Sequence, residues 1–137
     1  MSQYRVANGI YKIFCDGKWA RNSPGEPYIV LDDEEAPLPS FEQWDIQGVP
    51  GGFTIQNVAT GLYAYVDGPG QSLNLNNEAT VWYIQPAGGN DYHIFFPDHD
   101  SIWTSIFSRD PREFQFALRG SHGSPTQQIQ LIKADDN

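Results

Sequence analysis

Apolar and polar residues alternate along most of the chain in short runs. Stretches such as "GIYKIF" (9–14) and "GFTIQN" (52–57) place apolar side chains at every second position, which is the period of a β-strand with one buried face. No long stretch keeps apolar residues at the i, i+3, i+4, i+7 spacing of an amphipathic helix. Thirteen glycines and ten prolines separate the runs. The pattern predicts an all-β protein.

The runs recur as three units of four strands each. The opening strands carry Ile13, Ile55 and Ile94, which are 42 and 39 residues apart. The strands expected in the first unit are "GIYKIF", "KWAR", "YIVL" and "QWDIQ"; those of the second are "GFTIQN", "LYAY", "SLNL" and "VWYIQ"; those of the third are "NDYHIF", "IWTS", "FQFAL" and "QIQLI". The three repeats are predicted at residues 8–47, 51–86 and 90–133.

Three such units predict one β-trefoil domain over residues 1–137, with twelve strands. WD40 propeller blades have a similar period, but about four or more are needed to close a propeller. In a β-trefoil six strands form a barrel and three hairpins cap it, so most sheet edges are paired.

Composition and charge narrow the function classes. A net charge of −9 repels nucleic acid and anionic membrane surfaces. The only cysteine, Cys15, leaves no internal disulfide, as is usual in a reducing compartment. The first residues, "MSQYRVANGIY", lack a basic start followed by an apolar run, so no signal peptide is predicted. We expect a cytoplasmic monomer.

Candidate catalytic and metal-binding groups are sparse. The three histidines, His93, His99 and His122, are not accompanied by a second cluster of ligands at metal-binding spacing. The segment "GSHGS" (120–124) is not the G-x-S-x-G motif and lacks its strand–turn–helix context. No enzyme activity, metal site or cofactor is predicted. Function is instead expected in the loops of the barrel.

A lectin-like carbohydrate-binding protein is one alternative, because many β-trefoils bind sugars. Ricin-type lectin repeats end in Gln-x-Trp and line each pocket with an aspartate and a stacking aromatic. Here Gln43 stands directly before Trp44, and no glutamine stands two places before Trp82. Both tryptophans are therefore predicted to lie in the core. The aromatic residues left as possible sugar platforms are Tyr63, Tyr65 and Trp103.

Protease binding through a presented loop is the main hypothesis. The segment "RNSPGEP" (21–27) follows the second predicted strand, and its prolines fix φ and extend the residues before them. Such preorganisation lowers the cost of ordering a loop on binding. The predicted reactive loop consists of Arg21, Asn22, Ser23, Pro24 and Gly25, with Arg21 or Asn22 as the side chain that enters the protease pocket.

The chain as a whole resembles the mycospins, small serine protease inhibitors of mushrooms. The resemblance rests on "GIYKIF", "WARN", "YIVLDDE", "WDIQ", "VWYIQPAGGNDYHI" and "QIQLIKADD". It implies a cytoplasmic defence protein that inhibits trypsin-like or chymotrypsin-like serine proteases through the loop between the second and third strands. That loop is shorter here, by several residues, than in the family member compared. The mycocypins, cysteine protease inhibitors on the same fold, are a further alternative.

A second loop occupies the related position in the third unit. The segment "SRDPRE" (108–113) contains Arg109, Asp110, Pro111 and Arg112, which are the secondary candidates for protease binding. Local pairing of these charges across a turn is the simpler explanation of the segment, and such exposed pairs contribute little free energy.

Overall fold

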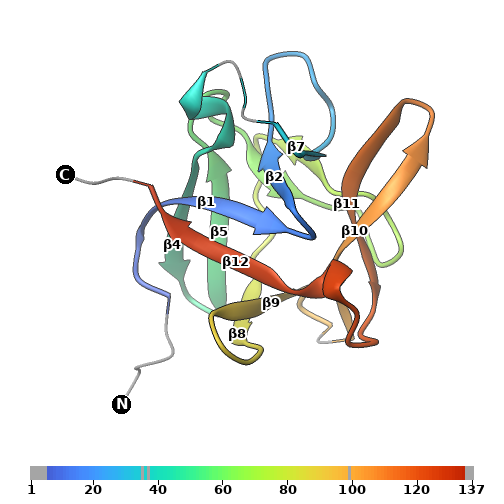
Figure 1. Ribbon diagram of the computed structural model, residues 1–137. Coiled ribbons are helices and arrows are strands. Elements are labelled where there is room, and N and C mark those ends of the chain that lie inside the picture. The colour runs from blue at the N-terminus through green and yellow to red at the C-terminus, as the bar shows by residue number, and fades with distance from the viewer. Residues whose placement is uncertain (1–5, 35, 37, 99, 135–137) are drawn as a thin grey trace.

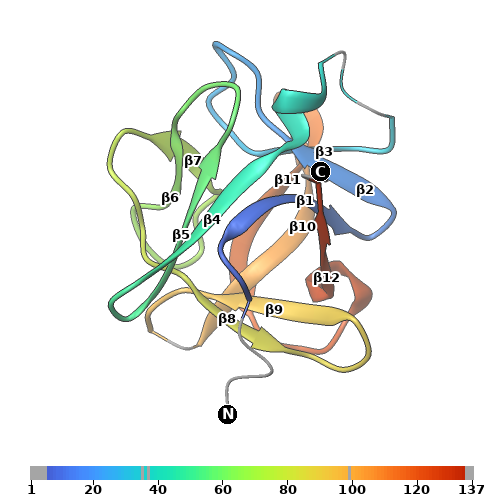
Figure 2. The ribbon, with the colours of Figure 1, turned by 90° about the vertical axis from the view of Figure 1, so that its left-hand side faces the viewer.

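The computed structural model describes residues 6–34, 36, 38–98 and 100–134 (Figures 1 and 2). It contains twelve strands and two short 3-10 helices, and among the described residues no helix is long and apolar enough to cross a membrane. The strands are β1 (Gly9–Cys15), β2 (Lys18–Arg21), β3 (Val30–Asp32), β4 (Trp44–Val49), β5 (Gly52–Asn57), β6 (Tyr63–Tyr65), β7 (Asn74–Asn76), β8 (Tyr83–Pro86), β9 (Asp91–Phe95), β10 (Ser101–Arg109), β11 (Arg112–Gly120) and β12 (Ile129–Lys133); the helices are η1 (Pro39–Glu42) and η2 (Pro125–Gln127).

Six strands close into a barrel. Strand β1 pairs with β4 and β12, β4 pairs with β5, and β9 pairs with β8 and β12. The ring is completed between β5 and β8, where Phe53 and Trp82 exchange two backbone hydrogen bonds of 2.8 and 2.7 Å. A Cβ atom at Gly52 would clash with the Trp82 carbonyl oxygen, so closure here requires glycine.

Three hairpins, β2–β3, β6–β7 and β10–β11, cap the barrel. They contact one another directly: β3 pairs with β11 through Leu31 and Phe114, and single bridges join Tyr28 to Asn74 and Ser72 to Ala117. A six-stranded barrel with three capping hairpins is a β-trefoil, so the predicted fold is confirmed.

The core is built from the alternating positions found in the sequence. Ile13, Ile55 and Ile94 are buried, and so are Trp44 and Trp82. The indole nitrogens of the two tryptophans donate to equivalent carbonyls in the first two units, Ala20 at 3.0 Å and Ala64 at 3.3 Å. The prediction that both are core residues is therefore confirmed.

The third unit departs from the expected pattern in two ways. Trp103, considered as an exposed sugar platform, is fully buried and packs edge-on against Trp82, with ring centroids 5.2 Å apart. The segment 108–113 is not an extended loop, because β10 and β11 stay paired from Ser101–Gly120 to Arg109–Arg112. Only Asp110 and Pro111 form the turn, so this hairpin is much longer than its two counterparts.

Cys15 is expected to be chemically inert in the folded protein. Its side chain is buried and its thiol donates to the Thr126 carbonyl at 3.4 Å. Burial, with a smaller contribution from Asp16, raises the pKa of the Cys15 thiol to about 12, so almost no thiolate exists at neutral pH. A disulfide reagent at pH 8 should label one thiol in urea and almost none in buffer; rapid labelling of the native protein would contradict this packing.

A loop and a groove as the candidate site

The predicted reactive loop is held from inside by Asn22. The Asn22 side chain is fully buried, and its amide nitrogen donates to the Glu26 carbonyl at 3.0 Å and the Tyr28 carbonyl at 3.3 Å. Its backbone nitrogen donates to Phe41, which anchors the loop to the segment before β4. Asn22 therefore shapes the loop and does not project from it, which corrects the prediction that it offers its side chain to a protease.

The loop tip is braced by a second set of hydrogen bonds. The Glu26 carboxylate accepts from both the backbone nitrogen and the hydroxyl of Ser23, each at 2.9 Å, and the Glu26 backbone nitrogen donates to the Ser23 carbonyl at 3.0 Å. Pro24, Gly25 and Pro27 are the exposed residues of this tip, which stands out from the cap in Figure 1. These hydrogen bonds order the loop, and they add to the φ restriction that Pro24 and Pro27 impose.

Arg21, the other predicted anchor, forms an ion pair. Its guanidinium pairs with the Asp32 carboxylate at 3.6 Å, across the β2–β3 hairpin. About a quarter of its side chain is exposed, 23%. Arg21 therefore faces the surface between the first and third units.

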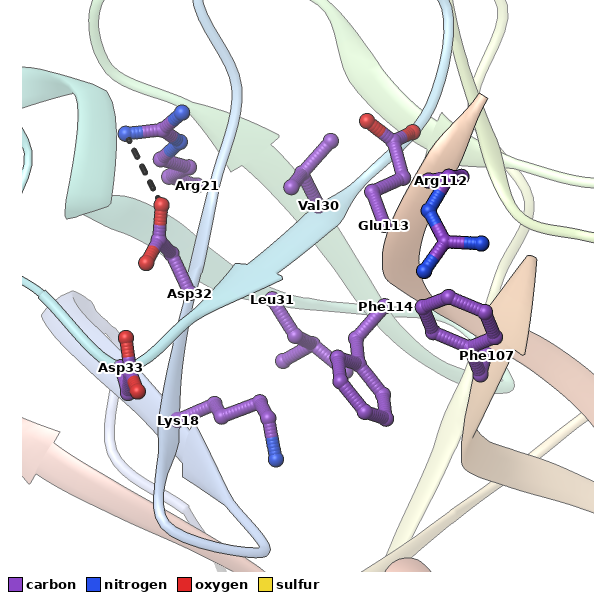
Figure 3. Close-up of a pocket in the computed structure, with 10 residues that line it drawn as sticks. All are labelled: Lys18, Arg21, Val30, Leu31, Asp32, Asp33, Phe107, Arg112, Glu113 and Phe114. Carbon is purple, nitrogen blue, oxygen red and sulfur yellow. Dashed lines mark ion pairs between the residues drawn. The ribbon is translucent and has the colours of Figure 1, made fainter. Parts of the chain in front are cut away.

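This surface contains a groove of about 410 Å³ (Figure 3). Because β3 pairs with β11, the groove brings together residues far apart in the sequence. Arg21 and Arg112, one from each predicted loop, both line it, whereas Arg109, Asp110 and Pro111 do not. The lining residues are Lys18, Arg21, Val30, Leu31, Asp32, Asp33, Phe107, Arg112, Glu113 and Phe114.

Two phenyl rings give the groove an apolar wall. Phe107 and Phe114 face each other across the β10–β11 hairpin, with ring centroids 5.2 Å apart at 63°. Lys18 places its ammonium 4.1 Å from the Phe114 centroid, and the Arg112 guanidinium lies 5.5 Å from that of Phe107. Phe107 is 47% exposed, and its contact with Phe114 makes the two rings a local apolar surface.

Sequence reasoning missed most of this groove. It identified Arg21 and Arg112 as loop residues but not the rings between them. The available signal was the run from Phe107 to Phe114, which a two-residue turn at Asp110–Pro111 folds into a hairpin with both rings on one face.

A second hollow, of about 360 Å³, lies away from the loop where β9 meets β12. Its lining is uncharged and comes from Gly89, Asn90, Tyr92, Gln130, Leu131 and Ile132. Across the described ranges no three His, Cys, Asp or Glu side chains come close enough to hold a metal; His99 lies outside those ranges. Burial lowers the pKa of His93. Its ring lies edge-on to Phe95, with centroids 6.0 Å apart, and it lines neither cavity.

Part of the chain is similar to a known family. Residues 41–104 match the family model described as ricin-type β-trefoil lectin domain-like. The matched segment covers less than half of the chain and includes none of the groove residues, so the match bears on the fold and does not assign the groove. A comparison with curated proteins gives no match.

Solved structures similar to the chain include lectins and part of an enzyme. A ricin B-like lectin of Macrolepiota procera, in complex with lactose, has a TM-score of 0.79 at 18% identity, covering 95% of this chain and 99% of its own. The Rhizoctonia solani agglutinin has a TM-score of 0.77 at 17% identity, covering 97% and 100%. An endo-β-galactosidase of Clostridium perfringens has a TM-score of 0.76 at 15% identity, and the alignment covers 92% of this chain and 32% of the enzyme. At these identities the likeness shows the fold alone.

Proposed function

We propose that the protein is a carbohydrate-binding, lectin-like β-trefoil and that the groove between its first and third units holds the saccharide. The observation that carries the proposal is the exposed Phe107–Phe114 wall bordered by charged side chains. Sugar-binding sites need an apolar surface for the C–H face of the ring and polar groups for its hydroxyls, and ligand sites in general combine these two features. The lectins of similar fold add support.

Replacing Phe107 by alanine is expected to weaken saccharide binding by at least about tenfold. Truncating a central aromatic anchor costs about 2 kcal/mol or more, and 1.4 kcal/mol corresponds to a factor of ten. A glycan array would identify the saccharide, and calorimetry would compare the wild type with Phe107→Ala. Tyr83→Ala is the matched control, because Tyr83 is also an exposed aromatic, at 37%, but lies outside the groove.

The glycan array tests the function, and the comparison of variants tests the site. Absence of binding to every glycan on the array would reject the carbohydrate function. Binding that survives Phe107→Ala would leave the function standing but move the site away from the groove.

Inhibition of a serine protease is a second candidate function, supported by the hydrogen bonds that preorganise residues 22–27. Standard-mechanism inhibitors bind through such a rigid, exposed loop. Since Asn22 is buried and Arg21 pairs with Asp32, the contact would have to come from the exposed backbone of the tip. Near-stoichiometric suppression of trypsin or chymotrypsin on a chromogenic peptide would support it. Full protease activity at a large excess of the protein would reject it.

A further inference from the structure

Only one of the three cationic side chains in the groove, Arg21, forms an ion pair with another described residue of the groove. The Asp32 carboxylate forms an ion pair with Arg21. The Glu113 carboxylate accepts a 2.7 Å hydrogen bond from the Gln115 side chain. The Lys18 ammonium contacts the Phe114 ring and donates to the Asp16 carbonyl at 3.3 Å, and Arg112 contacts the Phe107 ring. Among the residues that the structure describes, neither cation has a carboxylate within ion-pair distance. Of the three cationic side chains of the groove, Arg21 is in an ion pair, whereas Lys18 and Arg112 are paired with no described carboxylate. The Asp33 and Glu113 carboxylates also line the groove.

Lys18 and Arg112 lie on either side of the apolar wall. In Figure 3 the Lys18 ammonium is directed toward Phe114 and away from Asp33, while Arg112 extends beside Phe107. Centroid distances of 4.1, 5.2 and 5.5 Å link Lys18, Phe114, Phe107 and Arg112 in a row. A cation resting on a ring face is held in place without being neutralised, so each end of the wall keeps a positioned donor.

From this arrangement we infer that the groove selects a saccharide bearing a carboxylate, such as a uronic or sialic acid residue. The inference rests on the proposed carbohydrate function and names its substrate class. The sugar ring packs on Phe107 and Phe114, and its carboxylate accepts hydrogen bonds from Arg112, whose planar guanidinium matches a carboxylate in two-point geometry. The Lys18 ammonium contacts the saccharide at the opposite end of the wall.

Long-range electrostatics do not produce this preference. The chain has a net charge of −9, which repels anions at distances beyond the groove. Selection of an acidic sugar therefore depends on direct contact with Arg112 and Lys18. A hexaglutamate peptide would meet the same repulsion and has no ring to pack on the phenyl wall, so it serves as the competing occupant in the test.

The test compares acidic oligosaccharides of the uronate and sialate types with their own methyl esters, which keep the sugar but remove the charge. By calorimetry, at least one acid should bind the wild type at least about fivefold more tightly than its ester. In the Arg112→Gln variant the affinities for acid and ester should differ by less than about twofold, and the variant should still bind the ester. Arg119→Gln is the matched control, since this exposed arginine is on the same strand but outside the groove.

Every other result overturns the inference, and the results separate it from the proposed function. If esters or neutral glycans bind as tightly as the acids, the substrate class is wrong while carbohydrate binding stands. The substrate class is also wrong if both the Arg112→Gln and the Lys18→Gln variants still prefer the acid to its ester. If a hexaglutamate peptide binds as tightly as the acids, the groove recognises charge and not sugar. If no saccharide binds at all, both proposals fail.

Discussion

Trp82→Ala is expected to lower the free energy of unfolding by about 3–5 kcal/mol, the range measured for large aromatic deletions in packed cores. Trp82 is fully buried at the point where β5 and β8 close the barrel. Its ring packs against Trp103 at 5.2 Å and Phe96 at 6.2 Å. The substitution leaves a cavity between the barrel and its cap, and it removes the indole donor from the Ala64 carbonyl.

Urea unfolding monitored by circular dichroism measures this loss. Trp19→Ala is the matched control, because it makes the same chemical change at a half-buried ring that packs on Phe14 at 4.5 Å. Such a ring pair contributes about 0.5–1.5 kcal/mol beyond its buried area, so the control should lose clearly less stability. Equal losses at both positions would contradict the account of the core.

Asn22→Ala is expected to cost about 2–3 kcal/mol and to release the loop. Removing the amide leaves the Glu26 and Tyr28 carbonyls, which are part-buried, without the donor that they share. An unpaired buried group costs about 1–3 kcal/mol. Limited proteolysis should then cut within residues 22–28, where the wild type resists. If the loop inhibits a protease, the same variant should be digested as a substrate.

Asn77→Ala is the control for this prediction. Asn77 is exposed, and surface substitutions of this kind change stability by less than about 0.5 kcal/mol. A variant lacking the Asn22 amide that unfolds at the wild-type urea concentration and stays uncut would show that the loop is ordered by something else.

The barrel was predictable because its information is local and periodic. Strands such as β1 and β5 alternate in the sequence and alternate in the structure, and the isoleucines at equivalent positions in the three units all enter the core. Strand β10 does not show this alternation. Its first five residues, from Ser101 to Ser105, are all buried, since both faces of this strand are covered. Trp103 could therefore not be assigned to the core by period two.

The candidate site was less predictable because it depends on a contact between distant segments. Leu31 and Phe114 become neighbours only when β3 pairs with β11, and no feature of either segment alone specifies that pairing. Asn22 illustrates a second limit. Asparagine is common in exposed turns, and only the inward path of the following residues turns its amide into a buried donor.

An NMR titration of the ¹⁵N-labelled protein with the saccharide selected by the array tests the central claim most directly. The account predicts that amide shifts change mainly in β2, β3 and the residues from 107 to 114, which surround the groove. Shifts that instead gather around Asn90, Tyr92 and Gln130, at the uncharged hollow, would contradict it.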